Sequence, residues 1–252
     1  MVKKILLPVV FVLLASCGNK DRDQGLTIAV AANMQFAMEE IAMAFTEETG
    51  VPCDLIIGSS GKLTAQIVEG APFDVLVSAD MKYPESLQDK GLAETDPEVY
   101  AYGSLVLWTL EDSLDLSLTL LKAKEISHIA LANPKTAPYG VAAEDVLRHY
   151  GMYEDLKGKL VFGESIAQTN QFITSGAAEA GFTALSVVMS PQMQGRGQWV
   201  IPDPASYEPI SQGMVVIRRE GGNTKSGVAF RDFVFSDRAR EILSEFGYLT
   251  NE

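Results

Sequence analysis

The chain has 252 residues, of which 47% are hydrophobic, and its formal net charge is −13. This size and composition allow a sizeable core in one large domain or two medium ones, and they exclude a disordered or fibrous protein. The negative charge and the lack of a basic run argue against a nucleic-acid partner, because phosphate binding requires clustered Lys and Arg.

The N-terminal stretch has the features of a secretion signal. A basic start, Lys3 and Lys4, precedes an apolar run over residues 5–15, which is too short for a bilayer that needs roughly 20 residues. The Leu-Ala-Ser-Cys sequence ending at Cys17 resembles the bacterial lipobox, after which the leader is removed and the cysteine is lipidated. We therefore expect residues 1–16 to be a lipoprotein signal peptide. An ordinary signal peptide with an incidental cysteine is the alternative.

The mature protein is accordingly expected at the cell envelope, on the periplasmic side of a bacterial membrane or on the cell surface, in contact with the membrane through its lipid alone. Residues 17–25 would form the lipidated cysteine and a short polar tether.

Beyond the tether, buried strands alternate with helices. Apolar runs predict strands at residues 26–32, 51–57 and 74–77, each followed by a helical pattern, and Asn33 is a candidate N-cap of the first helix.

The same alternation returns in the second half of the chain. An apolar run over residues 102–110 leads out of the first unit. Further strands are predicted at residues 128–131, 160–162 and 181–185, with helices at 140–150 and 166–175. The run 214–217 is expected to pair with 105–107 as a two-stranded hinge, and a helix over 228–246 would end the chain.

This pattern predicts an α/β protein with two lobes, each a mostly parallel sheet flanked by helices. Residues 26–104 plus 214–252 would form the first lobe, and residues 105–213 the second. In such sheets, ligands bind at the carboxyl ends of the strands, where the helices begin. The turns at these positions are therefore the candidate binding elements.

The turn Gly58-Ser59-Ser60-Gly61 is the clearest of these elements, since it joins an apolar strand to a helix. It presents free backbone N–H groups and serine hydroxyls at the positive end of a helix dipole, which is a geometry that binds anions. Lys62 follows, but the glycine spacing does not fit a phosphate-binding nucleotide loop. We expect the Lys62 amine to stay in water and to contribute only diffuse attraction. A flexible connector is the other interpretation of this turn.

Several motifs together resemble the molybdate-binding proteins of ABC importers, which have the type II periplasmic-binding-protein fold. The motifs, in chain order, are Ile28-Ala29-Val30-Ala31-Ala32-Asn33-Met34, Gly58-Ser59-Ser60-Gly61-Lys62-Leu63, Gly70-Ala71-Pro72-Phe73-Asp74-Val75, Ser78-Ala79-Asp80, Pro138-Tyr139-Gly140 and Gln212-Gly213. The resemblance extends from about Leu26 to Tyr248. It implies capture of molybdate, and of tungstate, in a cleft between the lobes and delivery to an ABC permease.

The resemblance also implies four ligand-binding positions. The serines of the family's first two turns fall on Asn33 and Ser60; Asn33 could donate through its amide and its backbone N–H. Backbone N–H contacts fall on Tyr139 and Ile166. A tyrosine hydroxyl that some members supply from a later strand falls on Ala184, which has none, whereas other members take a tyrosine from the third turn, as Tyr139 would provide.

The chemistry of these turns favours a fully ionised oxyanion. Molybdate and sulfate only accept hydrogen bonds at neutral pH, whereas phosphate keeps a proton and needs an acceptor in its site. None of the four turns offers a carboxylate, although Asp80 and Glu164 lie near in sequence. A donor-only site therefore prefers the dianion. A receptor of the same fold for sulfate is the alternative, since excluding sulfate depends on cavity size.

Catalysis has little support in the sequence. His128 and His149 have no second ligand at metal-binding spacing, and Ser60 has no evident base. We expect no enzymatic activity, no cofactor and no direct metal ligand, so that molybdenum would be held only as its oxyanion. The different-class alternatives are an exported hydrolase and a scaffolding lipoprotein.

The resemblance implies a monomer, and Cys53 is expected to be a small core residue.

Overall fold

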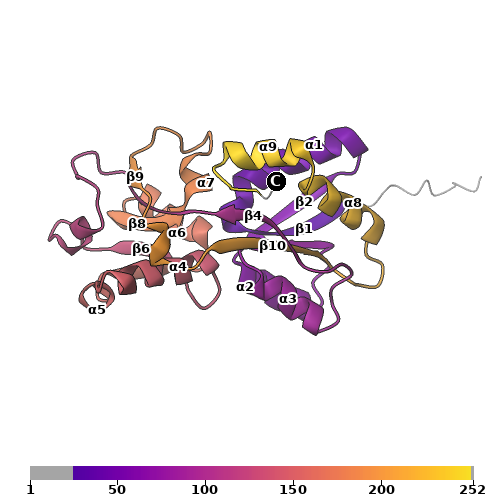
Figure 1. Ribbon diagram of the computed structural model, residues 1–252, viewed down its shortest axis with the longest axis horizontal. Helices are drawn as coiled ribbons and strands as arrows, with labels where there is room; N and C mark the ends of the chain where they lie inside the picture. The colour runs from indigo at the N-terminus through magenta and orange to yellow at the C-terminus, as the bar shows by residue number, and fades with distance from the viewer. Residues whose placement is uncertain (1–24, 251–252) are drawn as a thin grey trace, which may run out of the picture.

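The computed structural model describes residues 25–250, which form two lobes side by side (Figure 1). Each lobe contains one five-stranded sheet. The predicted signal peptide, residues 1–16, and Cys17 lie outside the described residues. Within the described part of the chain, every helix falls short of the length and apolarity needed to cross a membrane.

The sheet of the first lobe has the strand order β2-β1-β3-β10-β4. Strands β1, β2 and β3 are parallel, and β10 runs antiparallel to both of its neighbours. The strands are β1 (Leu26–Ala31), β2 (Cys53–Gly58), β3 (Val75–Val77), β4 (Glu98–Gly103) and β10 (Ile210–Val216). The lobe's helical elements are η1 (Ala32–Met34), α1 (Gln35–Thr49), α2 (Ser60–Val68), α3 (Lys82–Asp89), α8 (Thr224–Val234) and α9 (Asp237–Glu245).

The sheet of the second lobe has the order β7-β6-β8-β5-β9 and repeats this plan, with the reversed strand again in fourth place. Its strands are β5 (Leu105–Thr109), β6 (Ile129–Ala132), β7 (Leu160–Gly163), β8 (Ala180–Ala184) and β9 (Gln198–Val200). Its helical elements are η2 (Thr119–Lys122), α4 (Pro138–His149), α5 (Tyr153–Leu156), α6 (Ile166–Thr174), α7 (Leu185–Val188) and η3 (Pro204–Ser206).

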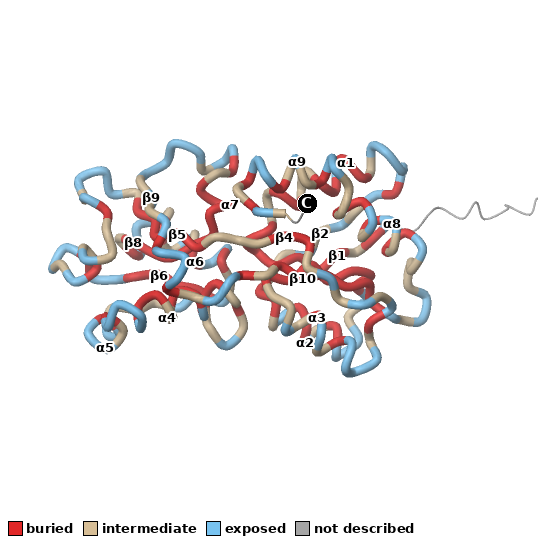
Figure 2. The backbone as a smooth tube through the Cα atoms, viewed as in Figure 1, coloured by how far each residue is buried: buried red, intermediate tan, exposed pale blue. Residues whose placement is uncertain are grey.

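Helices cover both faces of each sheet, and the central strands are therefore buried (Figure 2). In the first lobe, Met38, Ile41 and Phe45 of α1 pack with Phe230 of α8 over one face. Leu63 and Ile67 of α2 pack over the other face. The buried residues of α1 and of α2 thus recur three or four positions apart, so that they lie on one side of each helix.

The hinge differs from the predicted pairing. The run over residues 102–110 contains the end of β4 and the whole of β5, two strands that separate at Ser104 and belong to different sheets. Strand β10 pairs with β4, where Ile210 lies opposite Gly103, and β5 pairs instead with β8 and β9. The apolar run hid this break because only the short Gly103-Ser104 step marks it.

The C-terminal helical region also differs from its prediction. The expected helix over 228–246 is divided into α8 and α9. Ser236 separates them, since its hydroxyl accepts a hydrogen bond from Ala239 N and caps α9. The chain then passes beside β4, where Tyr102 N and Leu249 O are 2.7 Å apart.

Candidate functional site

A small cavity of about 10 Å³ lies between the lobes at the carboxyl ends of the strands. All four predicted positions, Asn33, Ser60, Tyr139 and Ile166, contribute to its wall. None of the described residues that line it is charged. The lining residues are Ala31, Ala32, Asn33, Gly58, Ser59, Ser60, Ala79, Ala137, Pro138, Tyr139 and Ile166.

Ser60 is the first residue of α2, and it is almost fully buried. Its hydroxyl oxygen accepts a hydrogen bond from the Ala79 N–H at 3.0 Å. Because this bond occupies an oxygen lone pair, it leaves the hydroxyl hydrogen available to donate into the cavity. The Ser60 hydroxyl can both donate and accept hydrogen bonds, and this contact orients it as a donor.

The backbone around Ser60 adds further donors. The first N–H groups of a helix have no partner within the helix. Gly61 N donates across the cleft to Thr136 O at 2.9 Å, whereas the N–H groups of Ser60 and Lys62 meet no acceptor within residues 25–250. A Cβ at Gly61 would lie 3.1 Å from Thr136 Cα, so glycine lets the two lobes approach closely here.

Asn33 lines the cavity, but its amide is engaged elsewhere. Its Nδ2 donates to Gln212 Oε1 at 2.8 Å and to Tyr248 Oη at 3.0 Å. Both amide hydrogens are therefore used in a buried network, and the expectation that the amide donates to a ligand does not fit this geometry. The backbone N–H of Asn33 is the donor that remains, since no acceptor for it occurs in the described chain.

Tyr139 is the second residue of α4 and is buried. Its hydroxyl makes no hydrogen bond to any described residue. It lies against Gly103, where a Cβ would collide with it. Burial raises the pKa of Tyr139 well above its ordinary value, so the hydroxyl keeps its proton and can act as a donor.

Ile166 is the first residue of α6 and lines the cavity. The preceding residue, Ser165, caps this helix by accepting a hydrogen bond from Gln168 N at 3.5 Å. The N–H groups of Ile166 and Ala167 meet no acceptor among the described residues. Ala184, at the end of β8, offers no hydroxyl, as the sequence indicated.

Sequence reasoning missed the network that orients Asn33. Gln212 and Tyr248 come from β10 and the C-terminal segment, and Ser186 comes from α7 of the second lobe. Ser186 Oγ donates to Asn33 O at 2.8 Å and lies 2.9 Å from Tyr248 Oη. Gln212 had a signal, because it belongs to a motif of the family resemblance, whereas no local pattern marked Ser186.

The charged groups near the turns lie outside the cavity. Lys62 Nζ forms an ion pair with Glu164 Oε1 of the second lobe at 2.6 Å, so its amine is not simply surrounded by water as predicted. Asp80 lines a separate groove beside Glu208 and Asp145. Burial raises the pKa of Asp80. Neither carboxylate that the sequence flagged therefore faces the anion site.

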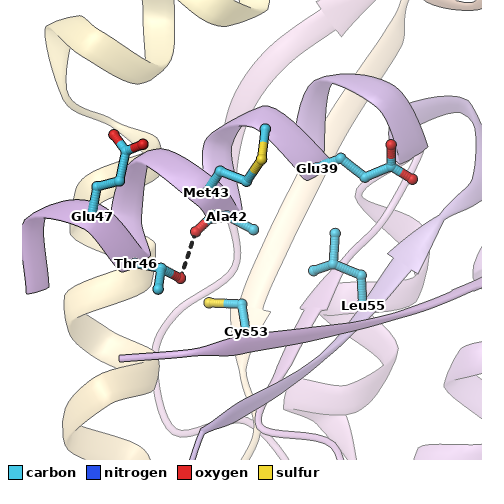
Figure 3. Close-up of a pocket in the computed structure, with 7 residues that line it drawn as sticks. All are labelled: Glu39, Ala42, Met43, Thr46, Glu47, Cys53 and Leu55. Atoms are coloured by element: carbon cyan, nitrogen blue, oxygen red, sulfur yellow. Dashed lines mark hydrogen bonds between the residues drawn. The ribbon is translucent and has the colours of Figure 1, made fainter. Parts of the chain in front are cut away.

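A larger hollow of about 640 Å³ lies on the outer side of the first lobe, between α1 and β2 (Figure 3). Glu39, Glu47, Met43 and Cys53 are among its lining residues. The two carboxylates would repel a dianion, and this hollow therefore does not suit the predicted ligand. Cys53 is partly buried here, and burial raises the pKa of its thiol to about 11, which keeps it protonated and unreactive at neutral pH.

The two-lobed fold, with a cavity between the lobes, is that of a solute-binding protein. A family model described as bacterial extracellular solute-binding protein matches residues 26–249. The chain therefore belongs to the bacterial extracellular solute-binding protein family. Membership indicates an exported protein, as the leader predicted.

Individual relatives agree with this assignment. The chain is 39% identical over 224 residues to the molybdate-binding protein ModA of Rhodobacter capsulatus, covering 88% of this chain and 87% of the relative. The solved structure of the periplasmic molybdate-binding protein of Azotobacter vinelandii matches with a TM-score of 0.85 and 33% identity, over 90% of this chain and 100% of that one. The prediction of a type II periplasmic-binding-protein fold is thus confirmed.

Proposed function

We propose that this protein captures molybdate, and tungstate as an ion of the same shape and charge, in the cavity between its lobes and delivers it to an ABC permease. The observation that carries the proposal is the composition of the cavity wall, which offers hydroxyl and N–H donors but no ionised side chain. Such a wall suits a dianion that only accepts hydrogen bonds. The two relatives named for molybdate support this choice of ion.

In this proposal, each lobe contributes two turns to the ion. The first lobe donates through the Ser60 hydroxyl and the backbone N–H of Asn33. The second lobe donates through Tyr139, by its N–H and its hydroxyl, and through the N–H of Ile166. The ligand favours the closed arrangement because only that arrangement brings both sets of donors together.

Calorimetry with four oxyanions tests the proposal. Both sheets and their helices lie within residues 25–250, so a soluble chain of residues 19–252 keeps the whole two-lobed fold. We expect tight binding of molybdate and tungstate and weak binding of sulfate and phosphate. Equal affinity for sulfate would instead assign the protein to sulfate, and tight phosphate binding would contradict a donor-only site.

The lipid anchor at Cys17 is a further part of the proposal. Several acyl chains at this residue would hold the receptor beside its permease, whereas one chain gives only weak, reversible attachment. Cells labelled with a radioactive fatty acid should yield a labelled protein, and Cys17→Ser should remove both the label and membrane association. A labelled Cys17→Ser protein would contradict the assignment.

A further inference from the structure

Ser59 stands at the N-cap of α2 but does not cap it. An N-cap serine ordinarily accepts a hydrogen bond from an N–H group two or three residues further on. Ser165 and Ser236 do so at the starts of α6 and α9. Ser59 has the extended backbone of an N-cap residue, with φ −77° and ψ 146°, yet its side chain makes no such bond.

A contact across the cleft engages one of the N–H groups that an N-cap serine could accept from at this position. Of the two N–H groups that Ser59 could accept from, Gly61 N donates to Thr136 O of the second lobe, and Lys62 N meets no acceptor among residues 25–250, Ser59 included. The Ser59 hydroxyl thus does not cap α2, although capping is the usual reason for a serine at this position.

The freed hydroxyl is buried without a partner. Ser59 is only 3% exposed, and its Oγ makes no hydrogen bond to any residue in the described part of the chain. Ser59 also lines the cavity between the lobes. A buried hydroxyl without a partner is costly, and such groups in native proteins call for a physical explanation.

We infer that Ser59 donates a hydrogen bond to the bound oxyanion, next to the bond from Ser60. This inference rests on the proposed function, and it adds a ligand-binding residue to it. A tetrahedral dianion has four oxygens, and each can accept more than one hydrogen bond, so two adjacent hydroxyls from one turn can be accommodated. The additional donor also strengthens the preference for a fully ionised oxyanion over one that carries a proton.

The test compares Ser59→Ala with Ser236→Ala, a serine that does cap its helix. In molybdate calorimetry, Ser59→Ala should weaken binding by about 10- to 150-fold, the loss expected for one hydrogen bond to a charged group. The melting temperature of its ligand-free form should not fall, because the hydroxyl has no protein partner. Ser236→Ala should show the opposite pattern: unchanged affinity and a melting temperature lower by about 2–4 °C.

The possible failures are distinguishable. If the unchanged protein binds molybdate and Ser60→Ala weakens binding while Ser59→Ala does not, the inference about Ser59 is wrong and the proposed function stands. A lower melting temperature of ligand-free Ser59→Ala with unchanged affinity would assign the hydroxyl to the fold and overturn the inference. If the unchanged protein does not bind molybdate, the proposed function fails, and this inference fails with it.

Discussion

The lobes meet in two regions that differ in their chemistry. Inside the cleft, neutral groups make the contacts: the buried Ser186 of the second lobe bonds to Asn33 of the first, and the partly buried Gly61 N bonds to Thr136 O. At the rim, the contact is ionic, between Lys62 and Glu164, whose side chains are 49% and 58% exposed. Where the lobes meet, the formal charges of this pair thus stay in water at the rim, and the cavity wall presents only neutral groups.

This division has a physical reason. An ionised side chain in the cavity would be expensive to desolvate when no ligand is bound. Neutral N–H and hydroxyl groups are less costly to bury, and several of them together can stabilise a dianion. The rim pair remains hydrated and screened, and it therefore contributes little to binding. If this reason is correct, the buried neutral groups should contribute more to molybdate affinity than the ion pair at the rim.

The largest effect is expected from Ser60→Ala. Losing one buried donor to a dianion should cost about 1.5–3 kcal/mol, or about 10- to 150-fold in molybdate affinity by calorimetry. Ser244→Ala, on the exposed side of α9, is the control and should bind as the unchanged protein does. Unchanged affinity of Ser60→Ala would mean that Ser60 does not contact the ligand.

A smaller effect is expected from Ser186→Ala, which removes the neutral hydrogen bond to Asn33 O. The cost should be about 0.5–1.5 kcal/mol, or about 2- to 12-fold in affinity, if the bond belongs to the closed state. Urea unfolding of the ligand-free variant is the second measurement. A loss of stability with unchanged affinity would show instead that α7 is a permanent junction between the lobes.

The sequence predicted more of the fold than of the cleft. Strand–helix alternation and helical spacing located most elements, because the buried apolar residues of a helix recur every three or four positions and those of a buried strand form a short continuous run. The predicted pairing of residues 214–217 with 105–107 at the hinge was wrong, because Gly103-Ser104 divides one apolar run into two strands without a long polar segment between them. The Asn33 network was missed because Gln212, Ser186 and Tyr248 are distant in sequence from Asn33, and only the tertiary fold brings them together.

The Lys62–Glu164 ion pair should contribute less than either buried group. An exposed pair is worth about 0.2–1 kcal/mol, so Lys62→Ala should weaken molybdate binding by at most about fivefold, and added salt should reduce the difference. Lys157→Ala is a matched control, because Lys157 pairs with Glu154 at 2.6 Å entirely within the second lobe. It should leave affinity unchanged. A loss for Lys62→Ala as large as that for Ser60→Ala would show that a formal charge contributes to the site.

The smallest effect is expected from pH. Burial raises the pKa of Tyr248 to about 12 and that of Tyr139 well above its usual range, so both hydroxyls stay protonated at neutral pH. Molybdate affinity should therefore be constant from about pH 7 to 9, since tyrosine ordinarily titrates near 10. A tenfold fall in affinity over that interval would show that a titrating group takes part in binding.

On the alkaline side, the buried Tyr248 hydroxyl should make stability fall above that interval. Between about pH 10 and 12 the unfolded chain releases the Tyr248 proton, whereas the folded chain retains it. The free energy of unfolding should therefore be fully present below about pH 10 and should fall as the pH rises toward 12. Urea unfolding at pH 9 and 11 measures this loss. Tyr248→Phe should reduce this loss of stability. The variant lacks the hydroxyl that the unfolded chain ionises near pH 10 and the folded chain keeps protonated.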